Sequence, residues 1–140
     1  MLPSINIFSS TAVYIQIENA VQFAIASGDL KADDQLPSVR QMSETLSINP
    51  NTVAKAYRDL EVMGLLYTRR GMGVYVNKGI QGRCQERCGT MIVKKLHEIT
   101  QEAKAAGMSK KEVGTIVNKS FGIDASPYSE TPKELLALSK

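Results

Sequence analysis

The fold of this chain is decided by residues 35–76, which read QLPSVRQMSETLSINPNTVAKAYRDLEVMGLLYTRRGMGVYV. The stretch contains two helix starts. Ser38 and Gln41 form a capping-box pattern, in which each side chain satisfies a free backbone N–H at the start of a helix. Asn49 is a capping residue, and Pro50 suits the first helical position because its missing N–H would have no partner there. The pattern predicts two short helices separated by a tight turn, which is a helix-turn-helix.

A hairpin is predicted directly after the second of these helices. Gly64 ends the helical period, and the β-prone runs 65–69 and 74–76 follow it. Gly71 and Gly73 lie between these runs and permit the positive φ of a tight turn. A hairpin in this place is a wing, so the stretch predicts a winged helix-turn-helix.

Further helices are predicted on both sides of this unit. Upstream, apolar residues recur at helical spacing over 12–27, with Ser10 or Thr11 as the cap and Gly28 as the stop. Downstream, apolar residues step by three and four along a longer helix over about 83–106.

The fold class is therefore mainly α with a small β-wing. A last helix begins at the capping-box pattern of Ser109 and Glu112 and reaches about Phe121, and a short turn is predicted at Leu135–Leu136. The expected organisation is a winged helix-turn-helix domain over 1–78, a linker over 79–82, a short two-helix region over 83–122 and a flexible tail over 123–140.

Composition narrows the class of function. The chain has 140 residues, 43% of them hydrophobic, and a formal net charge of +3, which is ordinary for a globular protein. No apolar run approaches the ~20 residues that span a bilayer, and the N-terminus lacks the pattern of a secretory signal. Two cysteines are too few for a disulfide framework. We therefore expect an intracellular protein that does not associate with membranes.

Catalytic patterns are missing from the sequence. There is no Gly-rich phosphate loop, no nucleophile elbow and no recognisable pair of catalytic carboxylates, and the chain has a single histidine. We expect no enzymatic activity, no cofactor and no bound metal.

The predicted helix-turn-helix carries a candidate surface for DNA. Such a protein places the start of its second helix in the major groove. Here Val53 and Ala56 would face the core of the protein, and the polar residues of the same helix would face the DNA. An arginine at a wing tip can enter the minor groove, and strand alternation directs Arg69 and Arg70 to opposite sides, so that one of them should face the duplex. The candidate DNA-binding residues are Ser38, Arg40, Asn49, Asn51, Thr52, Lys55, Arg58, Arg69, Arg70, Gly71 and Gly73.

Structural explanations for several of these residues stay open. Asn49 and Pro50 could serve only as caps, and Arg40 could be a solvated surface charge. Lys55 and Arg58 could pair only with acidic neighbours on their own helix.

Several ordered segments resemble the DNA-binding domain of GntR-family transcriptional regulators, over about residues 8–78. The resemblance is carried by Tyr14–Ile17, Ala24–Gly28, Gln35–Ser43, Ile48–Val53, Ala56–Glu61, Gly64–Leu66 and Arg70–Gly73. It implies a bacterial repressor that binds a near-palindromic, double-stranded DNA operator as a homodimer and is released by a small-molecule effector. The short helical tail resembles the YtrA-like subgroup, whose members often control transporter operons.

The resemblance also implies which residues contact DNA. In the family, contacts come from the arginine that matches Arg40, from the start of the recognition helix and from the wing. The matching positions here are Asn49, Asn51, Thr52, Arg70 and Gly71. Two positions depart from the family pattern, because Lys55 stands where many relatives carry arginine and Asp33 stands where a glycine is common.

The residues after the wing are expected to form an interface with a second copy of the chain. Two helices cannot bury a core alone, so their apolar stripes should pair across a two-fold axis and hold two recognition helices about one DNA turn (~34 Å) apart. The candidate dimerisation residues are Cys88, Ile92, Leu96, Ile99, Ala103, Val113, Ile116 and Val117.

The sequence also fits two alternative functions. The first is a winged helix used only for protein–protein contacts. The second is a thiol-responsive regulator, because Cys84 and Cys88 lie four residues apart on one helical face. A metal site that adds His97 to these cysteines would lack a fourth ligand of the Cys or His type.

Overall fold

Five helices and one hairpin make up the part of the chain that the computed structural model describes, residues 4–123. The elements are α1 (Val13–Ser27), α2 (Val39–Leu46), α3 (Pro50–Val62), β1 (Leu66–Arg69), β2 (Gly73–Val76), α4 (Gln81–Ala105) and α5 (Lys110–Ser120). The chain divides into two units between Cys88 and Gly89, and α4 contributes to both. The predicted turn at Leu135–Leu136 lies outside the described residues, as does the 123–140 tail apart from Ile123.

The helix-turn-helix begins its two helices as the sequence predicts. The Ser38 hydroxyl accepts a hydrogen bond from the Gln41 N–H at 3.0 Å, and the Gln41 side-chain oxygen accepts one from the Ser38 N–H at 2.9 Å. Asn49 caps α3 by accepting from the Asn51 N–H at 2.8 Å, and Pro50 occupies the first position. Both predicted caps are confirmed.

The start of α1 differs from the prediction. Ala12, rather than Ser10 or Thr11, occupies the cap position, and it provides no side-chain hydrogen bond. The buried Gln16 amide instead reaches back and donates to the carbonyl oxygens of Asn6 and Thr11, at 2.9 and 2.8 Å. A side chain one turn inside the helix therefore anchors the N-terminal segment, and local capping preference does not decide the boundary.

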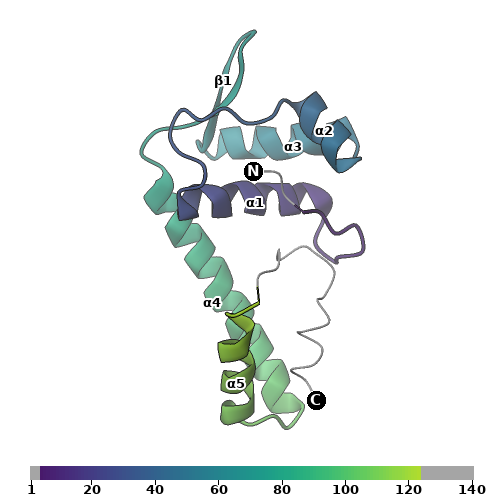
Figure 1. Ribbon diagram of the computed structural model, residues 1–140, viewed down its shortest axis with the longest axis vertical. Helices are drawn as coiled ribbons and strands as arrows, with labels where there is room; N and C mark the ends of the chain where they lie inside the picture. Colours follow the sequence, from purple (N-terminus) through teal and green to yellow (C-terminus); the bar gives the residue numbers. More distant parts are fainter. Residues whose placement is uncertain (1–3, 124–140) are drawn as a thin grey trace. The chain divides into compact units, whose positions relative to one another are not determined.

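The core of the first unit lies where α1 and α3 pack side by side (Figure 1). Ile17 and Val21 of α1 and Val53 and Leu60 of α3 are fully buried in it. Tyr57 links α3 to the segment before α2, because its hydroxyl donates a hydrogen bond to the Pro37 carbonyl oxygen at 2.7 Å. These contacts hold α3 firmly and leave its opposite face free.

The hairpin pairs Leu66 with Val76 and Arg69 with Gly73 in an antiparallel register, as predicted for a wing. The segment before α2 runs along β2, where the Asp33 N–H donates to the Val76 carbonyl oxygen at 2.8 Å. Asp33 has a φ of +67°, in the left-handed region that favours glycine. The fold therefore keeps the glycine-like backbone at the position where the family commonly has glycine.

The aspartate at this position gains hydrogen bonds that a glycine could not make. Its carboxylate accepts from the Tyr67 hydroxyl at 2.7 Å and lies 3.5 Å from the Lys78 ammonium group. The hydrogen bond from Tyr67 lowers the pKa of Asp33, and Lys78 adds to the effect.

Helix α4 begins at Gln81, two residues earlier than predicted, so part of the expected 79–82 linker is helical. Its first turns belong to the first unit, where Cys84 is part of the core and Arg83 donates to the Met63 carbonyl oxygen at 2.7 Å. Helix formation this early follows from packing, because Ile80 and Cys84 are both buried.

The second unit contains the rest of α4 and α5, joined by a turn at Gly107, which has a φ of +80°. Ser109 caps α5 by accepting from the Glu112 N–H at 3.1 Å. No residue of α5 is buried. Among the helices of residues 4–123, none is long and apolar enough to cross a membrane.

Candidate nucleic-acid interface

The start of α3 presents polar side chains outward and apolar ones inward. Asn49, Asn51 and Lys55 are exposed, whereas Val53 and Ala56 are completely buried. Thr52 is half-buried. This is the sorting that a helix needs if its first turns are to enter a groove while its other face holds it to the domain.

Cations are accessible on both helices of the helix-turn-helix. The Arg40 side chain is 87% exposed and pairs with Glu44 at 3.0 Å on the surface of α2. Such an exposed pair contributes little to stability, so a phosphate can replace the carboxylate at small cost. Arg58 is exposed and has no ion pair within the described part of the chain.

Lys55 has partners within its own subunit. Its ammonium group lies 3.1 Å from Asp59 and 4.5 Å from the centre of the Tyr14 ring. Ser38 is likewise engaged, since its hydroxyl caps α2. Both residues remain exposed, but a contact with DNA would use side chains that already have a structural role.

The two arginines of the wing have different surroundings. The Arg69 guanidinium lies over the rings of Tyr67 and Tyr75, at 5.8 and 5.5 Å from their centres, and these rings stack on each other at 5.6 Å. Arg70 stands in the turn, exposed, with no hydrogen bond, ion pair or ring contact in the described chain. Arg70 is therefore the wing arginine that is free to contact a ligand.

A hydrogen bond from the segment before α2 holds the tip of the wing. The Gln35 amide donates to the Met72 carbonyl oxygen at 2.9 Å. Gly73 has a φ of +130°, which favours glycine, and a Cβ there would lie 2.6 Å from the Gln35 amide nitrogen, so this side chain would have to move. Gly71 has open space around it, so the backbone at this point can be approached closely. In Figure 1 the hairpin rises on the side of α3 that faces away from α1.

A buried acidic residue lies behind this surface. Glu18 of α1 is only 8% exposed, and its Oε1 atom has no hydrogen-bond partner within residues 4–123. Burial, together with the neighbouring carboxylate of Asp59, raises the pKa of Glu18 to about 7, while Lys55 and Arg87 oppose the rise. The hydrogen bond with Glu18 lowers the pKa of Asp59, and Lys55 adds to that effect.

Sequence reasoning did not single out Glu18. Its position could have indicated burial, because it follows Ile17 and lies four residues after Tyr14, on the face of α1 that was expected to be buried. A carboxyl group on such a stripe requires either a partner or a proton.

The predicted dimerisation residues differ in accessibility. Ile92, Leu96 and Ile99 of α4 are 47%, 48% and 55% exposed, and Val117 of α5 is 38% exposed. Val113 and Ile116 are half-buried. Cys88 and Ala103 are buried within the single chain, so they are not part of an exposed stripe, which begins at Ile92. The helical spacing predicted one stripe, but packing in each unit covers some of its members.

The thiols of Cys84 and Cys88 are poorly placed for redox sensing. Both are free and buried. Burial raises the pKa of each, chiefly by disfavouring the thiolate, which is the reactive form. In the described residues, no three side chains of His, Cys, Asp or Glu are grouped as a metal site would require.

We expect both thiols to be protected in the native protein. At pH 8, reaction with a disulfide reagent such as DTNB should be at least ~100-fold slower than in urea, because it requires local opening of the structure. The variants Cys84→Ala and Cys88→Ala each keep a single cysteine, so they show which reaction rate belongs to which thiol. Rapid, stoichiometric reaction of the native chain would support the thiol-responsive alternative instead.

Several known proteins are similar in sequence to this chain. The family model described as bacterial regulatory proteins, gntR family, matches residues 13–76. The HTH-type transcriptional repressor YtrA of Bacillus subtilis (strain 168) is 36% identical over 105 residues, which cover 75% of this chain and 81% of that protein.

Two solved structures extend the likeness beyond the wing. A GntR family transcriptional regulator from Listeria monocytogenes has a TM-score of 0.61 and 33% identity, and the match covers 79% of this chain and 96% of that one. YtrA from Sulfolobus acidocaldarius, a GntR-family transcription factor, has a TM-score of 0.52 and 29% identity, covering 85% of this chain and 96% of that one.

Proposed function

This chain belongs to the GntR family of bacterial regulatory proteins, and from that membership we propose that it is a repressor that binds a near-palindromic operator as a homodimer. As a member of the family it is a DNA-binding transcriptional regulator with a winged helix-turn-helix, and its relatives are regulators rather than enzymes. Beyond family membership, we propose the operator, the dimer, the residues that contact DNA and a location in the cytoplasm. We also propose a transporter operon as the regulated target, because the short helical tail resembles the YtrA-like subgroup.

One observation carries the proposal. The polar start of α3 and the unpartnered Arg70 of the wing belong to the same unit, and both are exposed among residues 4–123. Duplex DNA is a dense line of negative charge whose major groove admits one helix. A polar helix start and a free cation, both exposed on one unit, are suited to it.

In the proposed complex the two elements have separate roles. Asn49, Asn51 and Thr52 meet base edges and phosphates in the major groove, with Arg40 and Arg58 on the flanking backbone. Arg70 enters the adjacent minor groove, and Gly71 and Gly73 let the wing backbone approach a phosphate. Arg69 stays on the tyrosine rings and keeps the hairpin rigid.

The dimer would be formed by the exposed stripe of Ile92, Leu96 and Ile99, with Val113, Ile116 and Val117 of α5 completing the apolar surface. A charged solvent-exposed helix does not need three large apolar residues on one side, so a second copy of the chain accounts for them. A two-fold dimer would match the symmetry of a near-palindromic operator.

We expect Arg70→Ala to weaken operator binding by ~1–3 kcal/mol, about 5–150-fold, because the arginine has no structural role to lose and its contact with DNA is removed. The measurement is a gel shift with DNA from upstream of the chain's own gene, repeated with scrambled DNA of the same length and at several salt concentrations. Lys94→Ala, an exposed cation of α4, is the matched control and should bind as the wild type does.

Two outcomes would contradict the proposal. Wild-type binding that does not weaken with salt, or no DNA binding at all, would favour the winged helix as a protein-interaction module. An Arg70→Ala variant with wild-type affinity would remove the wing from the interface.

A further inference from the structure

A cluster of charged side chains lies behind the exposed face of α3, and the proposed DNA interface does not use it. Glu18 of α1 lies there with Lys55 and Asp59 of α3 and with Arg87 of α4. Glu18 is 8% exposed, and its Oε1 atom has no hydrogen-bond partner within residues 4–123. Buried carboxyl groups are normally paired or hydrogen-bonded, so this oxygen calls for an explanation.

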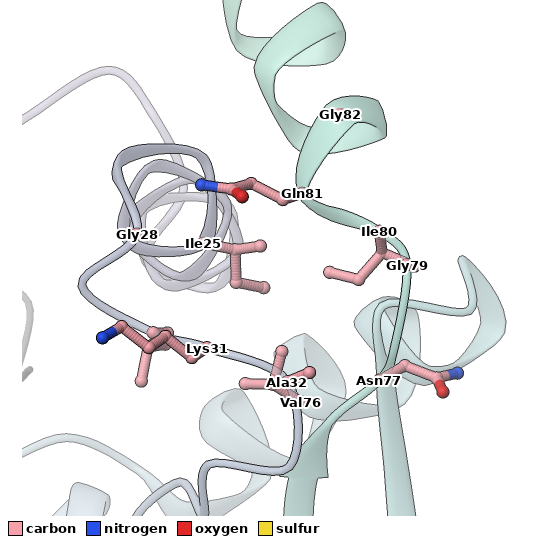
Figure 2. Close-up of a pocket in the computed structure, with 11 residues that line it drawn as sticks. Ile25, Gly28, Lys31, Ala32, Val76, Asn77, Gly79, Ile80, Gln81 and Gly82 are labelled. Carbon is pink, nitrogen blue, oxygen red and sulfur yellow. The ribbon is translucent and has the colours of Figure 1, made fainter.

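The position of Glu18 follows from the packing of α1 on two other helices. Helix α1 lies side by side with α3 (Figure 1). Figure 2 shows the side chains of Ile25 and Ile80 pointing toward one another where the end of α1 meets the start of α4. Farther along α4, Arg87 donates to the Gln22 side-chain oxygen at 2.8 Å, and the Gln22 amide donates to the Glu18 carbonyl oxygen at 3.3 Å. The carboxyl group is therefore enclosed by three helices.

Lys55 connects this cluster with the surface of α3. Its ammonium group lies 3.1 Å from the Asp59 carboxylate and 4.5 Å from the centre of the Tyr14 ring, and its side chain is 46% exposed. It lies one helical turn after Asn51, an exposed residue of the proposed interface. An ion pair as exposed as this one contributes little to stability, so a DNA phosphate can replace Asp59 as the partner of Lys55.

The cost of moving Lys55 depends on the proton of Glu18. When Glu18 is protonated, it donates a hydrogen bond to Asp59, which keeps this partner after the ammonium group leaves. When Glu18 is ionised, two carboxylates lie together, and removing Lys55 takes away one of the charges that offset their repulsion. The cations that act on these two carboxylates are Lys55 and Arg58 of α3 and Arg87 of α4.

We propose that Glu18 is a positioning residue of the DNA interface, which holds Lys55 within the subunit when it is ionised and lets Lys55 move to a DNA phosphate when it is protonated. This inference rests on the proposed DNA-binding function and adds Lys55 to its contacts. The transfer of the ammonium group to DNA removes a positive charge that favours the carboxylate of Glu18. The complex therefore takes up a proton from solvent at this residue.

The sign of the pH dependence follows from this proton uptake. Below the pKa of Glu18 in the free protein, about 7, the group is protonated both with and without DNA, so the affinity does not change with pH. Above that pKa the free protein loses a proton that the complex keeps. The affinity for DNA therefore decreases as the pH rises above 7.

Fluorescence anisotropy of the full-length chain with labelled DNA from upstream of its own gene, at pH 6, 7, 8 and 9 and constant ionic strength, tests this inference. We expect wild-type affinity to decrease by about tenfold or more across the series, since each proton taken up changes the affinity by up to about tenfold per pH unit. Glu18→Gln cannot ionise and still donates to Asp59, so its affinity should stay nearly constant and exceed that of the wild type at pH 9.

A matched control makes the comparison specific to position 18. Glu61→Gln removes an exposed carboxylate from α3 and should show the pH profile of the wild type. Every variant keeps His97, the single histidine of the chain, so differences between their profiles do not come from it.

Lys55→Gln tests whether the effect passes through the lysine. It should weaken binding at pH 6, reduce the salt slope by about one for each lysine removed, and flatten the pH profile. In this background Glu18→Gln should no longer change the affinity at pH 9, because the two substitutions act on one contact. An effect of Glu18 on the fold alone would persist without Lys55.

Two results would overturn the inference. One is the same pH profile for the wild type and Glu18→Gln, and the other is an advantage of Glu18→Gln at pH 9 that persists in the Lys55→Gln background. Both leave the proposed DNA-binding function intact. The absence of DNA binding by every variant at every pH would instead refute that function, and this inference with it.

Discussion

Leu96→Glu is expected to separate the dimer into monomers and to weaken operator binding by about 10²–10⁴-fold, the range lost when two linked binding sites become independent. Leu96 lies between Ile92 and Ile99 on the exposed apolar stripe of α4. A glutamate there would have to lose its water in the interface, at a cost of several kcal/mol for an unpaired charge. In a two-fold dimer the substitution also occurs twice.

Size-exclusion chromatography with light scattering, at micromolar concentration, measures the first effect, and a gel shift measures the second. Circular dichroism should show an unchanged helix content, because Leu96 is not part of the buried core. Gln101→Glu is the matched control, since it adds the same charge to an exposed polar position of the same helix. A wild-type monomer, or a Leu96→Glu variant that stays dimeric, would refute the proposed interface.

Glu18→Gln is expected to stabilise the protein above pH 7 by up to ~3 kcal/mol, which follows from the difference between the folded and unfolded pKa values. The folded pKa of Glu18 is raised from 4.5 to about 7. Between these values the folded protein holds a proton that the unfolded chain has released, so wild-type stability decreases as the pH rises from 4.5 to 7. A glutamine carries a permanent N–H donor in the same place and removes this loss.

The carboxyl of Asp59 does not alter the sign of this effect. Its pKa is lowered, so it is ionised in both states across the same pH range, and it accepts the hydrogen bond that protonated Glu18 donates. Glutamine at position 18 can still donate to it. The Lys55–Asp59 pair on α3 should therefore be kept in the variant.

Urea unfolding at pH 5, 6, 7 and 8 measures this prediction. Wild-type stability should decrease over the series while that of Glu18→Gln stays nearly constant, and Glu61→Gln, an exposed glutamate of α3, should follow the wild type. A Glu18→Gln variant that is less stable than the wild type at pH 8 would show that the ionised carboxylate of Glu18 does not destabilise the folded protein, which contradicts the raised pKa.

Local signals in the sequence were sufficient for the helix-turn-helix and the wing. The capping box at Ser38, the cap at Asn49 and the hairpin glycines each depend on neighbours within three residues, and all were found as predicted. The start of α1 was missed because Gln16 bonds to Asn6, ten residues away. Capping preferences describe only the chain next to a helix end, so they could not predict this bond.

The sequence by itself determined the fold class, the two helices of the DNA-binding motif and the set of polar residues available at their surface. Only the tertiary structure decided how those residues differ: Arg69 lies on two tyrosine rings while Arg70 is free, Cys88 is buried, and Glu18 lies beside Asp59. The reason is physical. Capping and strand alternation act over a few residues, whereas burial, pKa and pockets depend on which distant segments the core brings into contact.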